Sequence, residues 1–128
     1  MSQSTGTMGD YTLGEASVDI DTKYYTFIRK DVTTGKVVTC GDGERMAGIQ
    51  QNKPKAGEGV SVRTQGTSKL VVDGTQGGGI GIGAKLKSDG SGRGIVTTSD
   101  GDEIGAIAQE ASTAADDVIE VALVNRQA

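Results

Sequence analysis

Residues 37–60, VVTCGDGERMAGIQQNKPKAGEGV, align without a gap with residues 95–118, IVTTSDGDEIGAIAQEASTAADDV. Eight of the 24 aligned positions are identical: Val38/Val96, Thr39/Thr97, Asp42/Asp100, Gly43/Gly101, Ile49/Ile107, Gln51/Gln109, Ala56/Ala114 and Val60/Val118. Each segment has the pattern of a strand, an Asp-Gly turn, a second strand, and a polar connection before a third strand. We therefore predict an internal repeat over about residues 28–60 and 86–118, with its copies related by a pseudo-two-fold axis. The alternative is that two unrelated hairpins look alike because tight turns require the same residues.

The composition around these segments is typical of strands. The chain has 12 Val, 9 Ile and 14 Thr but only 4 Leu, and β-branched residues suit a pleated surface. Its 21 glycines and single proline indicate many tight turns. Strand-like runs occur at 16–20, 24–29, 36–40, 45–50, 60–64, 69–73, 84–87, 94–98, 103–109 and 118–124. We predict an all-β fold, a compact β-barrel or jelly-roll-like sandwich, with at most one short helix, at Gln109–Ala115.

The chain length and the apolar content limit the number of domains and the size of the core. Residues 1–14 are polar and lack an apolar period, which predicts a flexible N-terminal arm followed by a single β domain at 15–128. Only four aromatic residues are present, Tyr11, Tyr24, Tyr25 and Phe27, so the core is thin. A thin core favours stabilisation by oligomerisation or by a partner surface, and an ordinary monomer is the alternative.

Residues that carry catalytic chemistry are scarce. Histidine is absent, and the lone Cys40 lies in a strand-like run, so catalytic triads and zinc sites are not expected. The glycine-rich stretch at residues 79–84 matches a dinucleotide-binding pattern, but no helix-forming sequence follows it, and a bend or bulge is the better interpretation. We predict no enzyme activity, no cofactor and no metal. A weak surface calcium site stays open at three carboxylate clusters: Asp19/Asp21, Asp100/Asp102/Glu103 and Asp116/Asp117.

Charge and hydropathy argue against two classes of binding partner, nucleic acids and membranes. The net charge is −4 and the basic residues are scattered, which argues against nucleic acid. No window has the roughly 20 apolar residues of a membrane-spanning helix, and the first fifteen residues lack the apolar region of a secretion signal. We expect a protein made in a bacterial cytoplasm, with no membrane partner.

The order of several short motifs carries a family resemblance. These are Met46-Ala47-Gly48-Ile49, AGEGVSV at 56–62, Gly-x-x-x-Leu-Val-Val at 66–72, Gly-x-x-Leu-Lys at 83–87, IGAIAQEA at 104–111 and DDVIEVALV at 116–124. The sequence is similar, over roughly residues 16–125, to the capsid cement or head decoration proteins of tailed bacteriophages.

The resemblance implies a structural protein of the virion. It would bind the outer surface of the capsid and stabilise contacts between major capsid proteins, as a homotrimer or a dimer. Terminal arms often make such contacts, so Tyr11 and Leu13 are our candidate capsid-contact residues. The alternative function is a carbohydrate- or receptor-binding β module of a phage tail or fibre.

Overall fold

The computed structural model describes residues 10–97 and 103–127, and nearly all of its regular structure is β-strand. The first five strands are β2 (Tyr11–Glu15), β3 (Phe27–Lys30), β4 (Val37–Thr39), β5 (Gly48–Gln50) and β6 (Gly59–Arg63). The next five are β7 (Thr67–Asp73), β8 (Lys85–Ser88), β9 (Gly94–Val96), β10 (Glu103–Ala108) and β11 (Ala115–Gln127). One 3₁₀ turn, η1 (Gln76–Gly78), follows β7. The all-β prediction is confirmed.

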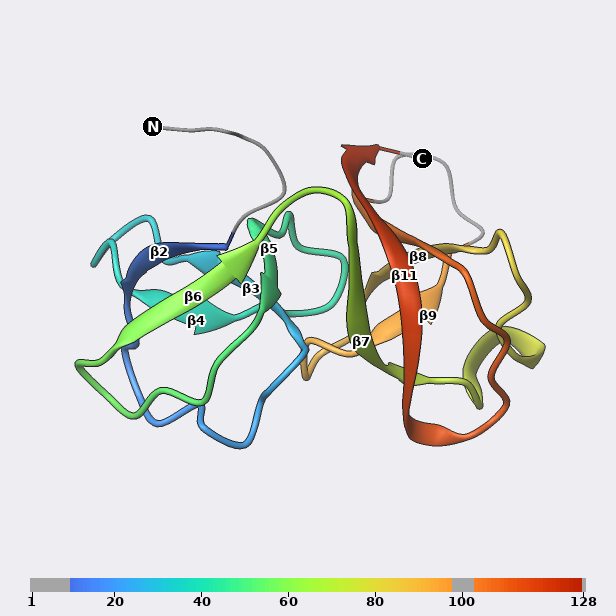
Figure 1. Ribbon diagram of the computed structural model, residues 1–128, viewed down its shortest axis with the longest axis horizontal. Coiled ribbons are helices and arrows are strands. Elements are labelled where there is room, and N and C mark those ends of the chain that lie inside the picture. The colour runs from blue at the N-terminus through green and yellow to red at the C-terminus, as the bar shows by residue number, and fades with distance from the viewer. Residues whose placement is uncertain (1–9, 98–102, 128) are drawn as a thin grey trace.

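The strands form two units of identical topology. The N-terminal unit (residues 10–63) is a sheet of order β2-β6-β5-β3-β4, and the C-terminal unit (residues 67–127) is a closed barrel of cyclic order β7-β11-β10-β8-β9. In the barrel, β7 and β9 pair in parallel through Val72 and Gly94. In the N-terminal unit the corresponding strands are β2 and β4, and a single parallel bridge between Ala16, just after β2, and Val37, in β4, connects these two edges of the sheet. Figure 1 shows the units side by side, joined by the short β6–β7 connection.

The loops repeat as well as the strands. The Tyr25 amide donates to the Gln50 carbonyl at 3.0 Å, and 58 residues later the Gly83 amide donates to the Ala108 carbonyl at 2.8 Å. Both Tyr25 and Gly83 have a positive φ, of 63° and 89°. Unrelated hairpins have no reason to share such loop contacts, so the chain is a duplication of a five-stranded unit. The repeat is therefore longer than the three-strand segments at 28–60 and 86–118.

The gapless alignment holds in only part of the repeat. Strands β3 and β5 correspond to β8 and β10 at a spacing of 58, because Phe27 pairs with Ile49 and Lys85 pairs with Ile107. The strands that pair with them follow other spacings. The residues of β4 that pair with β3 lie 57 positions before their counterparts in β9, and the residues of β6 that pair with β5 lie 59 positions before their counterparts in β11. The identical Val60 and Val118 are thus not equivalent. Val60 is fully buried, Val118 is 46% exposed, and the buried Ile119 takes the equivalent place.

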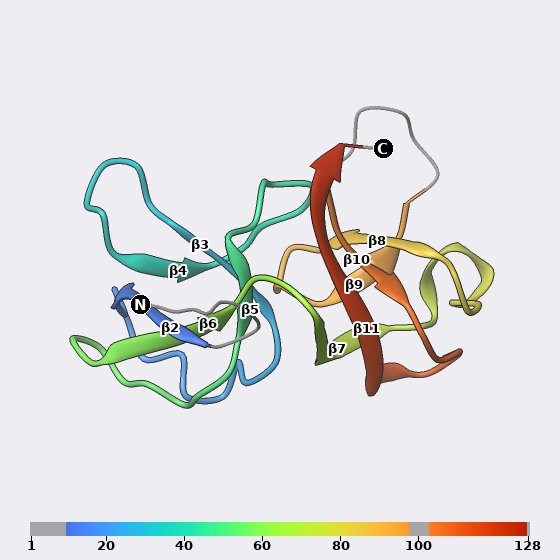
Figure 2. The same ribbon diagram turned by 45° about the horizontal axis from the view of Figure 1, so that its top comes forward.

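Two apolar clusters hold the molecule together. The smaller lies inside the N-terminal unit: Ala16, Ile20, Ile28, Val37, Val60 and Val62, with Leu13 against it. The larger joins the interior of the barrel to four residues of the N-terminal unit, Phe27, Cys40, Met46 and Ile49. The junction is therefore part of the core. Figure 2 shows the β4–β5 loop reaching across it, where the Gly43 amide donates to the Ser88 carbonyl.

Three local expectations need correction. Residues 109–114 form no helix, because Ser112 is held in an isolated β-bridge with Ile80 and the Gln109 amide donates to the Glu120 carbonyl. The expected strand at 16–20 is a loop after its first residue. The first strand is instead Tyr11–Glu15, with four of its five residues in the predicted arm, because its backbone pairs with β6 whatever the polarity of its side chains. Residues 1–9 of the arm lie outside the described residues.

Candidate functional site at the junction of the two units

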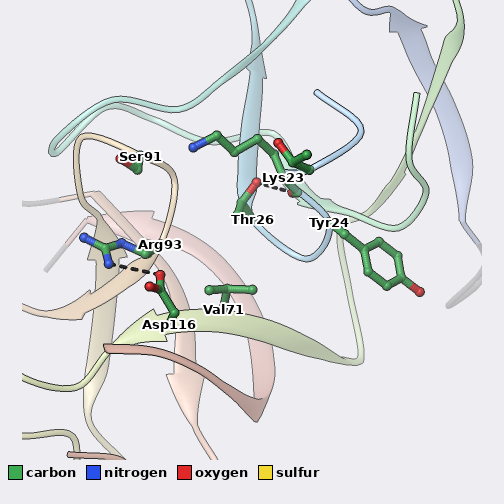
Figure 3. Close-up of a pocket in the computed structure, with 8 residues that line it drawn as sticks. Lys23, Tyr24, Thr26, Val71, Ser91, Arg93 and Asp116 are labelled. Carbon is green, nitrogen blue, oxygen red and sulfur yellow. Dashed lines mark hydrogen bonds and ion pairs between the residues drawn. The ribbon is translucent and has the colours of Figure 1, made fainter. Parts of the chain in front are cut away.

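A polar groove lies where the two units meet (Figure 3). It has a volume of about 290 Å³ and takes residues from both sides: Thr22, Lys23, Tyr24 and Thr26 from the N-terminal unit, and Val71, Ser91, Arg93 and Asp116 from the C-terminal unit. The N-terminal residues sit in the loop before β3, and Thr26 is fixed there by a hydrogen bond from its hydroxyl to the Lys23 carbonyl.

Arg93 is the main charged group of this groove. Its guanidinium contacts three carboxylates: Asp89 at 2.8 Å, Asp116 at 3.1 Å and Asp73 at 3.5 Å. Burial alone would lower the Arg93 pKa, but the carboxylates outweigh it and the pKa is raised. Since its charge is already compensated, Arg93 is poorly suited to bind an external anion. Its role is to fix the β8–β9 turn, whose Gly92 carbonyl accepts the Phe27 amide at 2.8 Å.

The stacked Tyr24 and Tyr25 rings lie beside the groove. Their centroids are 3.8 Å apart, the Tyr24 hydroxyl donates to the Tyr25 hydroxyl at 2.8 Å, and the Lys53 nitrogen lies 5.1 Å from the Tyr24 centroid. The contact with Tyr24 and burial raise the pKa of Tyr25. A positive φ is costly for a bulky residue, on the order of 1–3 kcal/mol. The Tyr25 carbonyl accepts the Val71 amide at 2.8 Å, so this backbone conformation is tied to the junction.

The groups that carry reaction chemistry have structural partners. Cys40 is fully buried, and burial raises its thiol pKa to about 11, so it is a packing residue in the folded state. No group of three metal-ligating side chains occurs among residues 10–97 and 103–127. Of the carboxylates named for calcium, Asp19 accepts the Ala56 amide and Asp117 accepts the Ser112 hydroxyl. Asp100 and Asp102 lie outside the described residues.

The predicted contact residues Tyr11 and Leu13 both lie in β2, and neither lines the junction groove. Tyr11 is 50% exposed, whereas Leu13 packs against the N-terminal cluster and offers little free surface. Sequence reasoning missed the junction roles of Tyr25 and Arg93, and it named Asp116 only as a member of a carboxylate cluster. A positive φ at a tyrosine or an aspartate leaves no mark on the sequence.

The glycine-rich stretch after β7 forms a bend. Gly79 and Gly83 have positive φ, Ile80 is buried, and β8 begins at Lys85 with no intervening helix. A dinucleotide site needs a helix N-terminus at this point, so the bend interpretation fits the structure. In the part of the chain that the structure describes, no helix could span a membrane.

The fold and this junction define a duplicated five-stranded β module, one copy of which closes into a barrel, held together by a shared apolar core. Its sequence matches the phage cement protein family over residues 19–123, so the chain belongs to that family and is a structural protein of a bacteriophage capsid. No curated protein is significantly similar in sequence. Among solved structures, the chain is similar to the base of the head fibre gp8.5 of bacteriophage phi29, with a TM-score of 0.69 and 11% identity. The match covers 95% of this chain and 98% of that one, and it shows a shared fold.

Proposed function

We propose that this protein is a non-enzymatic cement protein that binds the outer surface of a phage capsid and stabilises the contacts between major capsid proteins. The observation that carries the proposal is the family match, which spans both units from residue 19 to residue 123. The structure supports this function because the two units share one apolar core and therefore form a single two-lobed body. Such a body can bridge neighbouring subunits and resist their separation.

The proposal includes assembly and location. We expect a homotrimer, with a dimer as the alternative, made in the host cytoplasm and added to the outside of the shell. Tyr11 stays a candidate contact because half of its surface is exposed on β2. Leu13 is the weaker candidate because it packs against the N-terminal cluster.

Binding to purified shells tests the function directly. The full chain is incubated with expanded capsids lacking decoration, the shells are sedimented, and the bound protein is quantified against its input. We expect saturable binding at a fixed ratio to capsid subunits, together with a higher disruption temperature of the shells. Absence of binding to expanded capsids would exclude the cement function.

The alternative, a carbohydrate- or receptor-binding module, has weaker support. Protein sites for sugars use exposed aromatic faces, but one face of Tyr24 is covered by Tyr25, and Phe27 is fully buried. Saturable hits on a glycan array, lost when Tyr11 is replaced by alanine, would favour this alternative over the cement function.

A further inference from the structure

The duplication makes it possible to compare the same surface in two environments. At the junction, part of the C-terminal unit is covered by the N-terminal unit. We call this part the filled seat, defined by Lys87, Ser88, Glu103 and Gly105. At the spacing of 58 that relates β3 to β8 and β5 to β10, its counterparts in the N-terminal unit are Arg29, Lys30, Arg45 and Ala47. We call that surface the open seat.

The contacts of the filled seat show what such a surface binds. The Phe27 ring lies against Gly105, so closely that a β-carbon there would be 2.6 Å from Phe27 Cε1. Beside it, the Ser88 carbonyl accepts the Gly43 amide at 3.0 Å, and Lys87 Nζ lies 3.8 Å from Asp42 Oδ1. The seat thus takes an apolar side chain together with an acidic turn.

The open seat has similar features and a hollow shape. A groove of about 490 Å³ lies over it, lined by Arg29, Lys30, Val32, Glu44, Arg45, Met46 and Ala47. Val32, at the tip of the β3–β4 hairpin, is 97% exposed, the highest value among the exposed large apolar side chains of the described residues. With Val32 at its rim and Met46 and Ala47 in its lining, the groove offers apolar surface to a partner.

Charge indicates the kind of partner. Arg29 is bound to Glu44 at 2.8 Å and Arg45 to Glu103 at 3.1 Å, while Lys30 makes no ion pair with the described residues. The rim is therefore net basic and suits an acidic turn, as Lys87 suits Asp42 in the filled seat. A second copy of this chain fits poorly. The position equivalent to Phe27 is the exposed Lys85, which would bring another positive charge to a basic rim.

We propose that this protein binds a capsid subunit through the open seat. The part of the subunit that enters the seat is a surface turn, and this turn carries an apolar side chain and an acidic residue. The inference rests on the proposed cement function and names the surface that performs it. Ala47 stands where the filled seat has Gly105, so the incoming side chain sits above a methyl group and cannot approach as closely as Phe27 does.

Two seat variants and two matched controls test the proposal in the sedimentation assay. The seat variants are Val32→Asp and Lys30→Glu, both at exposed positions. The controls, Ile82→Asp and Lys85→Glu, introduce the same charged residues at exposed positions of the C-terminal unit. We expect each seat variant to bind expanded capsids at least about tenfold more weakly, with controls near wild type. Equal urea midpoints confirm that all four variants are folded.

The outcomes separate the surface from the function. If wild-type protein fails to bind capsids, the cement function itself is excluded. If wild type binds and the seat variants bind equally well, or the controls lose as much affinity, the function stands and the open seat is the wrong surface. Light scattering on the free protein gives a third outcome. If the seat variants change its self-association and leave capsid binding intact, the occupant is a second copy and the proposal is overturned.

Discussion

Replacing Gly105 by alanine tests the packing that joins the two units. The added β-carbon would lie 2.6 Å from Phe27 Cε1 and 2.9 Å from Met46 Cε, whereas ordinary carbon contacts begin near 3.4 Å. The ring must therefore move by about 0.8 Å inside a close-packed core. Overpacking of this kind costs about 1–3 kcal/mol in the free energy of unfolding. Gly105 has no positive φ, so the effect is steric and not a matter of backbone strain.

Urea denaturation measures this loss, as a midpoint lower by about 0.5–1.5 M if the slope is about 2 kcal/mol per molar urea. A second substitution, Phe27→Leu, removes the ring atoms that the new methyl group meets. The double variant should cost at least about 1 kcal/mol less than the sum of the single variants. Gly90→Ala is the control, because nothing lies within 4 Å of its β-carbon position. Additive effects, or a Gly105→Ala variant as stable as wild type, would refute the described junction.

Three further predictions concern buried or partnered polar groups. The Cys40 thiol, with its pKa raised to about 11 by burial, should react with a disulfide reagent at pH 8 at least about 100-fold faster in denaturant than in the folded protein. The Thr75 hydroxyl and amide lower the pKa of Asp73, so its carboxylate stabilises the fold fully above the unfolded-state pKa of about 4. This contribution is lost as the pH falls from there through the lower pKa of the folded state. Asp73→Asn should therefore flatten the acid decline of the urea midpoint, and an unchanged decline would contradict this role. Gln50, fully buried, donates to the Ile20 carbonyl at 2.8 Å, so Gln50→Leu should cost about 1–3 kcal/mol in denaturation experiments, and a neutral effect would show that water replaces the amide.

One cooperative transition is expected in all of these experiments. The larger apolar cluster contains Phe27 and Met46 from the N-terminal unit as well as the barrel interior. Because neither unit can lose these contacts alone, we propose that residues 15–128 behave as a single domain in unfolding. Two resolved transitions in urea would show that the units unfold separately.

The sequence predicts the strands well where turns separate short apolar runs. Nine of the ten expected runs overlap a strand of the structure. The missed strand, β2, is polar and exposed along much of its length, and it is held by backbone pairing with β6 rather than by an alternating apolar pattern. Backbone pairing of this kind leaves little trace in composition, so a polar strand such as β2 is not distinguished from an arm by sequence alone.

The repeat was visible in the sequence, but its register was not. The spacing of 59 across β6/β11 goes with an irregular pairing between Ala115 and Asp117, whereas the spacing of 57 across β4/β9 comes from a turn that is one residue shorter, residues 89–93 against residues 31–36. A bulge places an extra residue in one strand and turns the following side chains to the other face. Identity alone thus paired Val60 with Val118, although burial pairs Val60 with Ile119. Packing, which an ungapped alignment does not contain, decides the correspondence.

The two copies have also diverged in a way that explains why the pairing stops after two units. The N-terminal unit presents Phe27 to the filled seat, but the C-terminal unit carries the exposed Lys85 at that position, so it has no apolar side chain to offer a further unit. Gly105 leaves room for a ring, whereas its counterpart Ala47 carries a methyl group under an open groove. A head-to-tail contact repeated without such a change would produce an open-ended chain. The molecule therefore has one junction filled by its own chain and one similar surface left open, which suits the proposed binding of a capsid subunit.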